Sequence, residues 1–212
     1  MGISFAITAY NEHEELKVLL NQLEQIAKSD DEIVIQLDSK ATPEVLSLVD
    51  QFIDKNFNFT VKKCIFDLNN HFADFKNNLK SYCTKDWVFQ IDADETLSET
   101  FSRVIHEVLD ANDGIDLIAV PRVNIVKGLE QNDIIQWHWQ VNSQGWVNWP
   151  DPQQRIYKNA SHIKWERAVH ERLMGAKVDT ALPFEEEWSL YHHKNIDKQE
   201  KQNELYGKII RT

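Results

Sequence analysis

Short apolar runs alternate with amphipathic stretches along the first half of the chain. Apolar runs of strand length, rich in β-branched and aromatic residues, occupy residues 3–8, 32–38, 59–66 and 87–92. Between them, apolar residues recur at helical spacing over residues 11–27, 43–53 and 72–82. Four strands separated by three helices predict βαβ units, in which a mostly parallel sheet is flanked by helices. The sequence therefore predicts an α/β, Rossmann-like fold.

The pattern changes in the second half. A helix that ends near Gly114 and a strand over residues 115–120 continue the alternation. From about Asn124 the pattern of apolar and polar residues is irregular. It predicts a mixed, partly antiparallel region with short strands over residues 155–158, 164–170 and 188–192. The polar tail from Asn195 to Thr212 predicts a helix. No Pro/Gly linker divides the chain, so we expect one domain over residues 1–212.

An acidic cluster follows the apolar run at residues 87–91. Because side chains alternate along a strand, Asp92 and Asp94 can point the same way at the end of this strand. Two neighbouring carboxylates repel each other unless a cation lies between them, and oxygen ligands suit Mg²⁺ or Mn²⁺. The carboxyl ends of parallel strands are also where α/β sheets bind ligands. The cluster suggests a divalent cation that bridges the protein to a diphosphate; alternatively, it caps a helix that starts near Thr96.

Composition narrows the class of partner. An apolar content of 42% with 27% charged residues is ordinary for a globular protein. The net charge of −11 argues against a nucleic acid as partner, because phosphate backbones are bound by Lys and Arg. Cys64 and Cys83 are expected as reduced thiols, no apolar run is long enough to span a bilayer, and no leader precedes the first strand. These features predict a cytoplasmic protein with at most peripheral contact at the inner membrane surface.

Four motifs together resemble a known family. They are Ala6-Ile7-Thr8-Ala9-Tyr10-Asn11-Glu12, Leu37-Asp38-Ser39, Ile91-Asp92-Ala93-Asp94-Glu95 and Ala168-Val169-His170-Glu171. In this order the chain resembles a family 2 glycosyltransferase of the GT-A type. The segment 150–157, Pro-Asp-Pro-Gln-Gln-Arg-Ile-Tyr, is similar to the small branch of lipopolysaccharide-core and related sugar transferases. The resemblance implies a nucleotide-diphosphate sugar donor, Mn²⁺ or Mg²⁺, and transfer with inversion at the anomeric carbon.

The resemblance also implies roles for residues in the first half. It implies a donor-binding half over residues 1–123 and an acceptor-binding half over residues 124–212. The positions that would hold the nucleoside are Thr8, Tyr10, Glu12 and Asp38. An aspartate accepts a hydrogen bond from a ring N–H such as that of uracil, so Asp38 favours a UDP-sugar. Lys76 would neutralise part of the diphosphate, or is simply solvated. Asp92 would contact ribose or metal-bound water, and Asp94 would ligate the metal.

The second half must then supply the catalytic base and the acceptor site. A base opposite the diphosphate is expected at Asp151, in a proline-flanked loop, or at Glu171, with Glu95 as a third alternative. Arg155 would pair with the diphosphate or brace Asp151. His170 either joins the metal shell or packs as a structural histidine. Of His192 and His193, which are adjacent on a strand, only one can reach the site.

Six of the seven tryptophans lie between Trp137 and Trp188. We expect most of Trp137, Trp139, Trp146, Trp149 and Trp165 in the core, with one or two packed against a sugar face. The expected acceptor is the hydroxyl of a glycan or glycolipid.

Two other functions fit the acidic motif. A phosphatase similar to haloacid dehalogenases would use Asp92 as nucleophile and Asp94 as acid/base, although that class carries the motif on its first strand. A protein that binds a nucleotide sugar without turnover is the second alternative.

Overall fold

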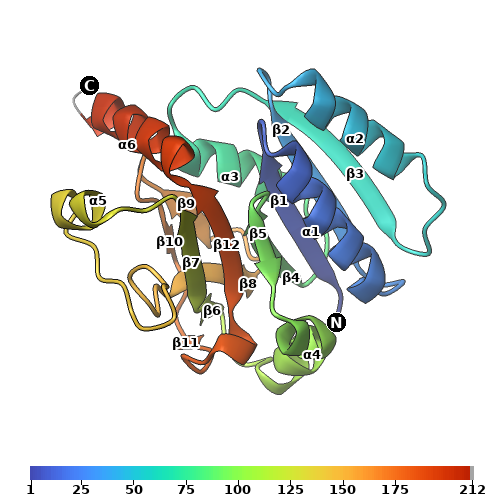
Figure 1. Ribbon diagram of the computed structural model, residues 1–212. Coiled ribbons are helices and arrows are strands. Elements are labelled where there is room, and N and C mark those ends of the chain that lie inside the picture. The colour runs from blue at the N-terminus through green and yellow to red at the C-terminus, as the bar shows by residue number, and fades with distance from the viewer. Residues whose placement is uncertain (211–212) are drawn as a thin grey trace.

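The structure is a computed structural model that describes residues 1–210, without the side chains of Gln202, Leu205, Lys208 and Ile210. Within these residues, a seven-stranded sheet with the order β11-β6-β8-β4-β1-β2-β3 crosses the molecule (Figure 1). Its strands are β1 Ile3–Ala9, β2 Glu32–Asp38, β3 Thr60–Phe66, β4 Trp87–Asp92, β6 Leu117–Val120, β8 Gln153–Lys158 and β11 Asp179–Ala181. The described chain also contains a small sheet β5-β12-β7, formed by Glu95–Leu97, Leu190–Asn195 and Arg122–Lys127, and a pair β9-β10, formed by Lys164–Glu166 and Arg172–Met174.

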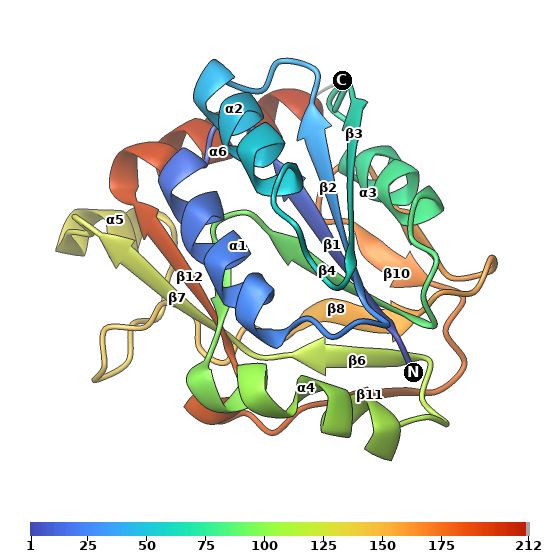
Figure 2. The ribbon, with the colours of Figure 1, turned by 90° about the vertical axis from the view of Figure 1, so that its right-hand side faces the viewer.

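Helices cover both faces of the large sheet. They are α1 His13–Ile26, α2 Pro43–Ile53, α3 Phe72–Ser81, α4 Glu99–Ala111, α5 Gln131–Gln136 and α6 Ile196–Ile210, with a short 3₁₀ turn η1 at Glu186–Trp188. The apolar faces of α1, α2 and α4 pack on one side against Phe5, Ile7, Phe89 and Ile91. Helix α3 and strands β9 and β10 pack on the other side (Figure 2). The predicted α/β fold, with helices around a mainly parallel sheet, is confirmed.

The parallel strands end at the same edge of the sheet. Strand β1 pairs in parallel with β2 and β4, and Thr8 lies opposite Asp92 in this register. Strand β2 ends at Asp38 and β4 ends at Asp92. The polar residues that follow these three strands are therefore gathered at one edge.

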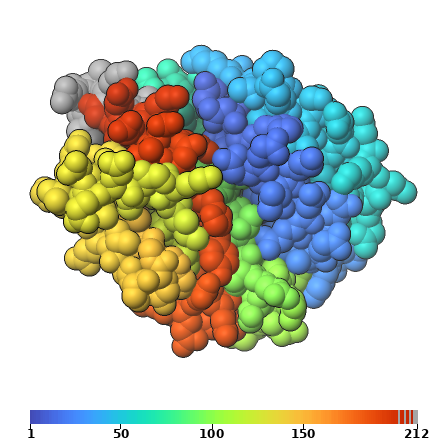
Figure 3. Space-filling model, in the orientation of Figure 1, coloured from blue at the N-terminus to red at the C-terminus, as the bar shows by residue number. Residues whose placement is uncertain are grey.

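Residues from the second half complete both sheets. Strand β8 inserts antiparallel between β4 and β6, so that Ile156 faces Phe89 and Ile118. Strand β12 lies between β5 and β7, antiparallel to the first and parallel to the second. In Figure 3 this strand forms part of a red band between the green segment that contains β5 and the yellow-green segment that contains β7. The late strand β12 thus lies beside β7, 68 positions earlier in the sequence, and β5, more than 90 positions earlier.

Several predicted elements differ in the structure. The strand expected over residues 164–170 is wrong, because β9 ends at Glu166, and Arg167 and His170 adopt positive φ values of 81° and 52°. The alternation at residues 135–139 belongs to the end of α5 and a turn. The helix expected near Thr96 begins at Glu99 instead, because the hydroxyl of Ser98 accepts a hydrogen bond from the backbone N–H of Phe101 at 3.2 Å.

The tail and the helices bear on two further predictions. The predicted C-terminal helix is present as α6, while Arg211 and Thr212 lie outside the described residues. Among residues 1–210, no helix is both long enough and apolar enough to cross a membrane.

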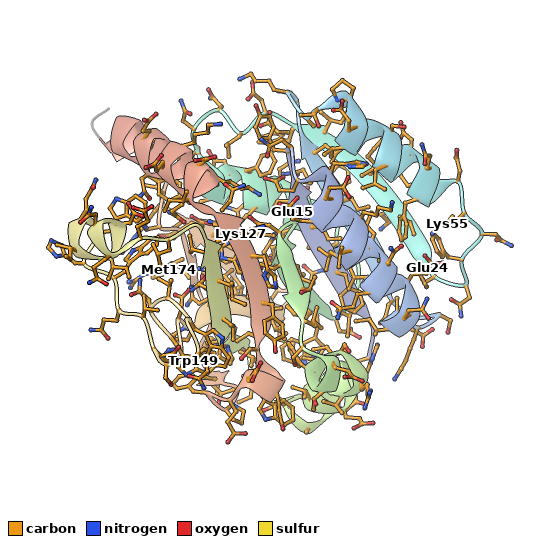
Figure 4. The ribbon with its side chains drawn as sticks, viewed as in Figure 1. Glu15, Glu24, Lys55, Lys127, Trp149 and Met174 are labelled. Carbon is orange, nitrogen blue, oxygen red and sulfur yellow. The ribbon has the colours of Figure 1, made fainter. Side chains whose placement is uncertain are left out.

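The tryptophans are less buried than expected. Of the five that we considered, Trp165 is in the core, at 4% exposure. The other four are partly exposed and pair with each other: the ring centroids of Trp137 and Trp139 are 4.7 Å apart, and those of Trp146 and Trp149 are 4.9 Å apart. Figure 4 labels Trp149 in the loop region that follows α5. Most of these rings therefore cover a surface lobe and do not fill the core, which corrects the prediction.

Candidate active site

A cavity of about 1130 Å³ opens at the carboxyl ends of β1, β2 and β4. It is as large as the pockets that hold drug-sized ligands. Most of the site residues predicted from the sequence line it, and Glu95, the third candidate base, does not; the lining residues include Thr8, Tyr10, Glu12, Asp38, Lys76, Asp92, Asp94, Asp151, Arg155, His170 and Glu171. Both predicted halves, residues 1–123 and 124–212, contribute to its wall. The structure thus brings these residues together, and their individual contacts decide what each can do.

Asp92 is held by groups of its own chain. The hydroxyl of Thr8 donates to its Oδ1 at 3.1 Å, and Nη2 of Arg155 donates to its Oδ2 at 2.6 Å. Burial alone would raise the pKa of Asp92, but the charges of Arg155 and Lys76 outweigh burial and hold the pKa well below its usual range. The expectation that Asp92 and Asp94 grip one cation between them does not match this geometry. Asp92 is already neutralised by a guanidinium.

Glu95 lies beneath Arg155 and Arg122. Its side chain has no exposed surface, its Oε1 accepts from Nη2 of Arg155 at 2.5 Å and from Nη1 of Arg122 at 3.1 Å, and its Oε2 accepts from the N–H of Asp92 at 3.1 Å. A carboxylate with these partners cannot meet an acceptor hydroxyl, which removes Glu95 as a base. Arg155 pairs with Asp92 and Glu95 and does not brace Asp151, so that part of the prediction is wrong.

Arg122 takes the bracing role that we expected of Arg155. Its Nε and Nη2 donate to Oδ2 of Asp151 at 3.0 and 2.8 Å. Asn124 donates to the same oxygen at 2.7 Å, and Nε2 of Gln153 donates to Oδ1 at 2.8 Å. Burial would raise the pKa of Asp151, but Arg122 and these donors lower it, so the carboxylate is ionised at neutral pH. Asp151 is a rigidly held, partly exposed anion in the cavity wall.

Asp94 has a different set of neighbours. Its side chain is 12% exposed, with Nζ of Lys198 at 3.3 Å and Nε2 of His192 at 3.4 Å from Oδ2. Burial opposes ionisation, but His192 and Lys198 outweigh it and lower the pKa of Asp94. Burial also lowers the pKa of His192, which favours its neutral form. The carboxylate of Asp94 and the imidazole of His192 therefore face each other at the rim of β4.

Glu171 is paired with a buried lysine. Its Oε1 lies 2.5 Å from Nζ of Lys76, and their side chains are 15% and 7% exposed. The same Nζ lies 4.7 Å from the ring centroid of Trp165 and 3.9 Å from Oδ1 of Asp92. Burial opposes ionisation of Glu171, but Lys76 lowers its pKa. Lys76 is therefore not a solvated surface lysine: it is a buried cation between two carboxylates.

His170 is not beside Asp94. It lies in the turn between β9 and β10, and its ring packs edge-on against Tyr206 with centroids 5.6 Å apart. The histidine beside Asp94 is His192, from β12, whereas the adjacent His193 is exposed. The expectation that at most one of these two reaches the site agrees with the structure, and the prediction of His170 as a metal ligand does not.

The residues expected at the nucleoside shape the loops at the strand ends. Oε2 of Glu12 accepts from the N–H groups of Tyr10 and Asn11 at 2.8 and 3.0 Å, and α1 accordingly begins at His13, later than predicted. Oδ1 of Asp38 accepts from the N–H of Lys40 at 2.8 Å, and its Oδ2 from the N–H of Leu68 at 2.9 Å. Each carboxylate oxygen of Asp38 therefore keeps a second acceptor position. Tyr10 is 47% exposed at the mouth.

The donor set can be tested against Mg²⁺ or Mn²⁺. Among the described residues, no group of three or more His, Cys, Asp or Glu is placed to hold a metal ion. Oδ2 of Asp94 and Nε2 of His192 are 3.4 Å apart, close to the roughly 3 Å between neighbouring ligands of an octahedral ion with bonds of about 2.1 Å. Carboxylate and imidazole both suit Mn²⁺. Asp94 and His192 therefore supply two donor atoms whose type and spacing suit such an ion.

The cavity is basic for so acidic a protein. Eight lysines and arginines line it against seven aspartates and glutamates, while the whole chain carries a net charge of −11. The basic residues are Lys40, Lys76, Arg122, Arg155, Arg172, Lys194, Lys198 and Lys201. Such a local concentration of cations attracts an anionic ligand.

Comparison with protein families identifies the chain. The model of glycosyl transferase family 2 matches residues 4–179. The chain belongs to glycosyl transferase family 2. The comparison with curated protein sequences gave no match.

Solved structures of TarS from S. aureus share the fold of this family 2 chain. The structure of TarS residues 1–349 matches with a TM-score of 0.62 and 15% identity, over 99% of this chain and 64% of that one. The complex of that fragment with UDP matches with a TM-score of 0.62 and 16% identity, over 99% and 65%. The complex with UDP-GlcNAc matches with a TM-score of 0.61 and 16% identity, over 92% and 59%. The chain thus spans less than two thirds of these TarS chains and shares their GT-A fold.

Sequence reasoning missed Arg122 and Asn124 in this glycosyltransferase-family chain. Both lie on β7, in the segment Arg122-Val123-Asn124, where polar and apolar residues alternate. The alternation signalled a strand with one polar face. What it could not show is that β12 would lie beside that strand.

Proposed function

We propose that this protein transfers a sugar from a nucleotide-diphosphate donor to a hydroxyl group, with inversion at the anomeric carbon. The observation that carries the proposal is Asp94 at the end of β4, beside His192 and inside a cavity lined with cations. A carboxylate and an imidazole on one side and lysines and arginines around them suit a pyrophosphate and its metal ion. Membership of glycosyl transferase family 2 supports the same reaction class.

In this proposal the ends of β1 and β2 hold the nucleoside. Tyr10 and Asp38 line the cavity where these strands end, and each oxygen of Asp38 can accept one more hydrogen bond. A ring N–H of uracil suits that acceptor, so UDP-sugars are the favoured donors. The TarS complexes with UDP and UDP-GlcNAc share only the fold at their level of identity, so this preference depends on Asp38.

The diphosphate would lie between Asp94 and the cationic wall. Asp94 and His192 would hold Mn²⁺ or Mg²⁺, which stabilises the negative charge on the departing diphosphate. Nζ of Lys76 lies 3.9 Å from Asp92, and Nζ of Lys198 lies 3.3 Å from Asp94. Arg155 holds Asp92 in place and keeps it ionised.

Asp151 is proposed as the catalytic base. Its Oδ2 accepts three hydrogen bonds from Arg122 and Asn124, whereas Oδ1 accepts one from Gln153 and keeps a free lone pair. Oδ1 would take the proton of the acceptor hydroxyl while the acceptor oxygen bonds to the anomeric carbon and the bond from that carbon to the diphosphate breaks. Glu171 is engaged by Lys76 at 2.5 Å and would instead orient this lysine.

The acceptor would enter beside the second half of the chain. Trp139, Val147 and Asn148, from residues 124–212, line the same cavity as Asp151. An indole ring at this position can pack against a sugar face. We propose a glycan or glycolipid hydroxyl as acceptor, and a location in the cytoplasm or at the inner membrane surface where such precursors are extended.

The geometry disfavours the phosphatase alternative. A nucleophilic aspartate needs an accessible oxygen, but both oxygens of Asp92 are engaged, one by Thr8 and the other by Arg155. The motif also ends the fourth strand and not the first.

The first experiment is a thermal-shift panel of nucleotide sugars with and without Mn²⁺. A ligand present at 100 times its Kd stabilises the folded state by about 2.7 kcal/mol, so a metal-dependent shift is readily visible. Asp94→Ala should abolish that shift, while Asp110→Ala, an exposed residue of α4, should not change it.

The same panel is followed by product analysis. Release of UDP from the donor supports a transferase, and release of phosphate from a monoester would support the phosphatase. Donor binding without release of UDP in the presence of candidate acceptors would support a binding protein. An unchanged shift in Asp94→Ala would remove Asp94 from the metal shell.

A further inference from the structure

One row of side chains crosses the small sheet β5-β12-β7. In the register of this sheet His192 on β12 lies opposite Glu95 on β5 and opposite Asn124 on β7. His192 is 6% exposed, and Asn124 lines the cavity next to it. Nδ1 of His192 and Oδ1 of Asn124 are 2.8 Å apart. The imidazole beside Asp94 is therefore bonded on its far side to an amide.

The amide of Asn124 can have only one orientation. Its Nδ2 donates to Oδ2 of Asp151 at 2.7 Å and to the carbonyl oxygen of Val147 at 3.3 Å. Both of these partners are acceptors only, since Asp151 is ionised, so a flipped amide would place oxygen against oxygen. The oxygen of the Asn124 amide must then face His192.

The orientation of this amide fixes the tautomer of His192. An amide oxygen accepts, so Nδ1 of His192 must carry the proton that it donates. In the neutral imidazole the single N–H is then on Nδ1, and Nε2, which lies 3.4 Å from Oδ2 of Asp94, carries the lone pair. Two acceptor atoms at this distance suit a cation, and Nζ of Lys198 already lies 3.3 Å from the same oxygen of Asp94.

We propose that Asn124 is a positioning residue that holds His192 in the Nδ1–H tautomer and links the metal side of the cavity to Asp151. The metal and base roles in this statement depend on the proposed function; the tautomer does not. The continuous path runs from the carboxylate of Asp151 through the amide of Asn124 to the imidazole of His192 and then to Asp94. A hydrogen bond to the distal nitrogen of a ligating histidine fixes the ring and raises its basicity toward a metal.

The first test observes the tautomer without any metal. Long-range ¹H–¹⁵N NMR spectra of the imidazoles at neutral pH distinguish Nδ1–H from Nε2–H. We expect His192 in the Nδ1–H form in the unaltered protein and a shift toward Nε2–H in Asn124→Leu. A dominant Nε2–H form of His192 in the unaltered protein would overturn the proposal.

The second test measures Mn²⁺ affinity by electron paramagnetic resonance in the absence of donor. His192→Ala should lose most of the affinity, and Asn124→Leu should weaken it by about tenfold, the lower limit for an outer-shell partner. His193→Ala is the matched control, since this histidine is adjacent in sequence and exposed, and its affinity should be unchanged.

A third variant distinguishes the role of the Asn124 amide oxygen, which accepts from His192, from that of its amide nitrogen, which donates to Asp151. Asn124→Asp keeps an acceptor for Nδ1 of His192 but loses the donor to Asp151. It should retain the tautomer and the Mn²⁺ affinity while its activity falls, whereas Asn124→Leu should lose both. Loss of Mn²⁺ affinity in Asn124→Asp with native circular dichroism would contradict the positioning role.

Failure of the metal-dependent function and failure of the positioning role of Asn124 give different results. If the unaltered protein binds no Mn²⁺ but His192 is in the Nδ1–H form, the metal-dependent function fails and the positioning role of Asn124 stands. If Mn²⁺ binds with equal affinity in Asn124→Leu and the unaltered protein, the proposed function stands and the positioning role fails.

Discussion

Buried carboxylates lie at both ends of the parallel strands, and their partners differ. At the amino end, Asp31 and Glu32 are 1% and 0% exposed. Asp31 accepts from the N–H groups of Ile3 and Lys28 and lies 2.8 Å from Nε2 of His106. Glu32 accepts from Ser4, from Lys62 and from both the N–H and the hydroxyl of Thr84. These acids tie the starts of β1 and β2 to neighbouring loops and helices.

At the carboxyl end, the acids lie in a cavity and are neutralised by side chains from distant elements. Asp92 is held by Arg155 of β8, and Asp94 lies beside His192 of β12 and Lys198 of α6. Asp31 and Glu32 also contact the side chains of His106 and Lys62, but neither lines the cavity, whereas Asp92 and Asp94 do. The comparison shows that burial alone does not mark a candidate functional carboxylate: an open space beside it does.

The largest effect on this comparison is expected when the proposed base, Asp151, is neutralised. Asp151→Asn should lower kcat by roughly 10²–10⁴-fold, because the amide cannot take a proton, while the affinity for the donor stays unchanged. Steady-state kinetics with matched donor titrations check this. The control is Asp113→Asn, an exposed carboxylate that should retain full kcat. An activity within threefold of the unaltered protein would show that Asp151 is not the base.

A carboxylate at the amino end should behave in the opposite way. Glu32→Ala would leave the donors of Ser4, Thr84 and Lys62 without their buried partner. We expect the free energy of unfolding to fall by about 3–5 kcal/mol, the usual cost of breaking a buried ion pair. Chemical denaturation measures this loss. Residual folded protein should still bind the donor with unchanged Kd, and a loss of binding in folded protein would argue against the division between the two ends.

The pH dependence of stability should reflect the same acids. Burial would raise the pKa values of Asp31 and Glu32, but hydrogen bonds from His106, Lys62 and Ser4 lower them below their ordinary values. A carboxylate with a lowered folded-state pKa stabilises fully above its unfolded-state pKa of about 4, and this contribution is lost as pH falls through the folded-state value. The free energy of unfolding should therefore decrease below about pH 4. Denaturation curves in Asp31→Asn should show a shallower decrease, and an equal slope would contradict the assignment.

The smallest effect is expected at a surface pair. Lys55 and Glu24 lie 2.7 Å apart at the ends of α2 and α1, where Figure 4 labels them near each other. Both side chains are substantially exposed, so Glu24→Ala should change the free energy of unfolding by less than about 1 kcal/mol. Thermal unfolding at low and high salt checks this. A larger loss would mean that this pair belongs with the buried acids and not with the surface.

The features predicted correctly are those encoded in contiguous segments. The strand runs that end at Thr8, Asp38 and Asp92 each carry their own apolar pattern, and parallel pairing then places their ends together. The features missed or wrongly assigned depend on contacts between distant strands. Nothing near Arg122 in the sequence shows that Asp151 will lie 2.8 Å away. Nothing near His192 shows that Asp94 will lie 3.4 Å away.

The wrong assignments have a similar physical origin. His170 matched a family motif in sequence, but a backbone φ of 52° places it in a turn whose ring contact is Tyr206. The tryptophans were expected in the core because large apolar side chains usually bury, yet Trp137 and Trp139 cover each other on a lobe. Local sequence gives the type of a side chain, and only the packing of the whole chain gives its neighbours.

The position of β12 between β5 and β7 has a consequence for the order in which this protein matures. Synthesis delivers residues 190–195 after all seven strands of the large sheet, so the nascent chain has the carboxyl ends of β1, β2 and β4 long before it has His192. Insertion of one late strand then adds the imidazole and seats it against Asn124. The ability to bind a metal ion would therefore be gained in one step, the insertion of β12.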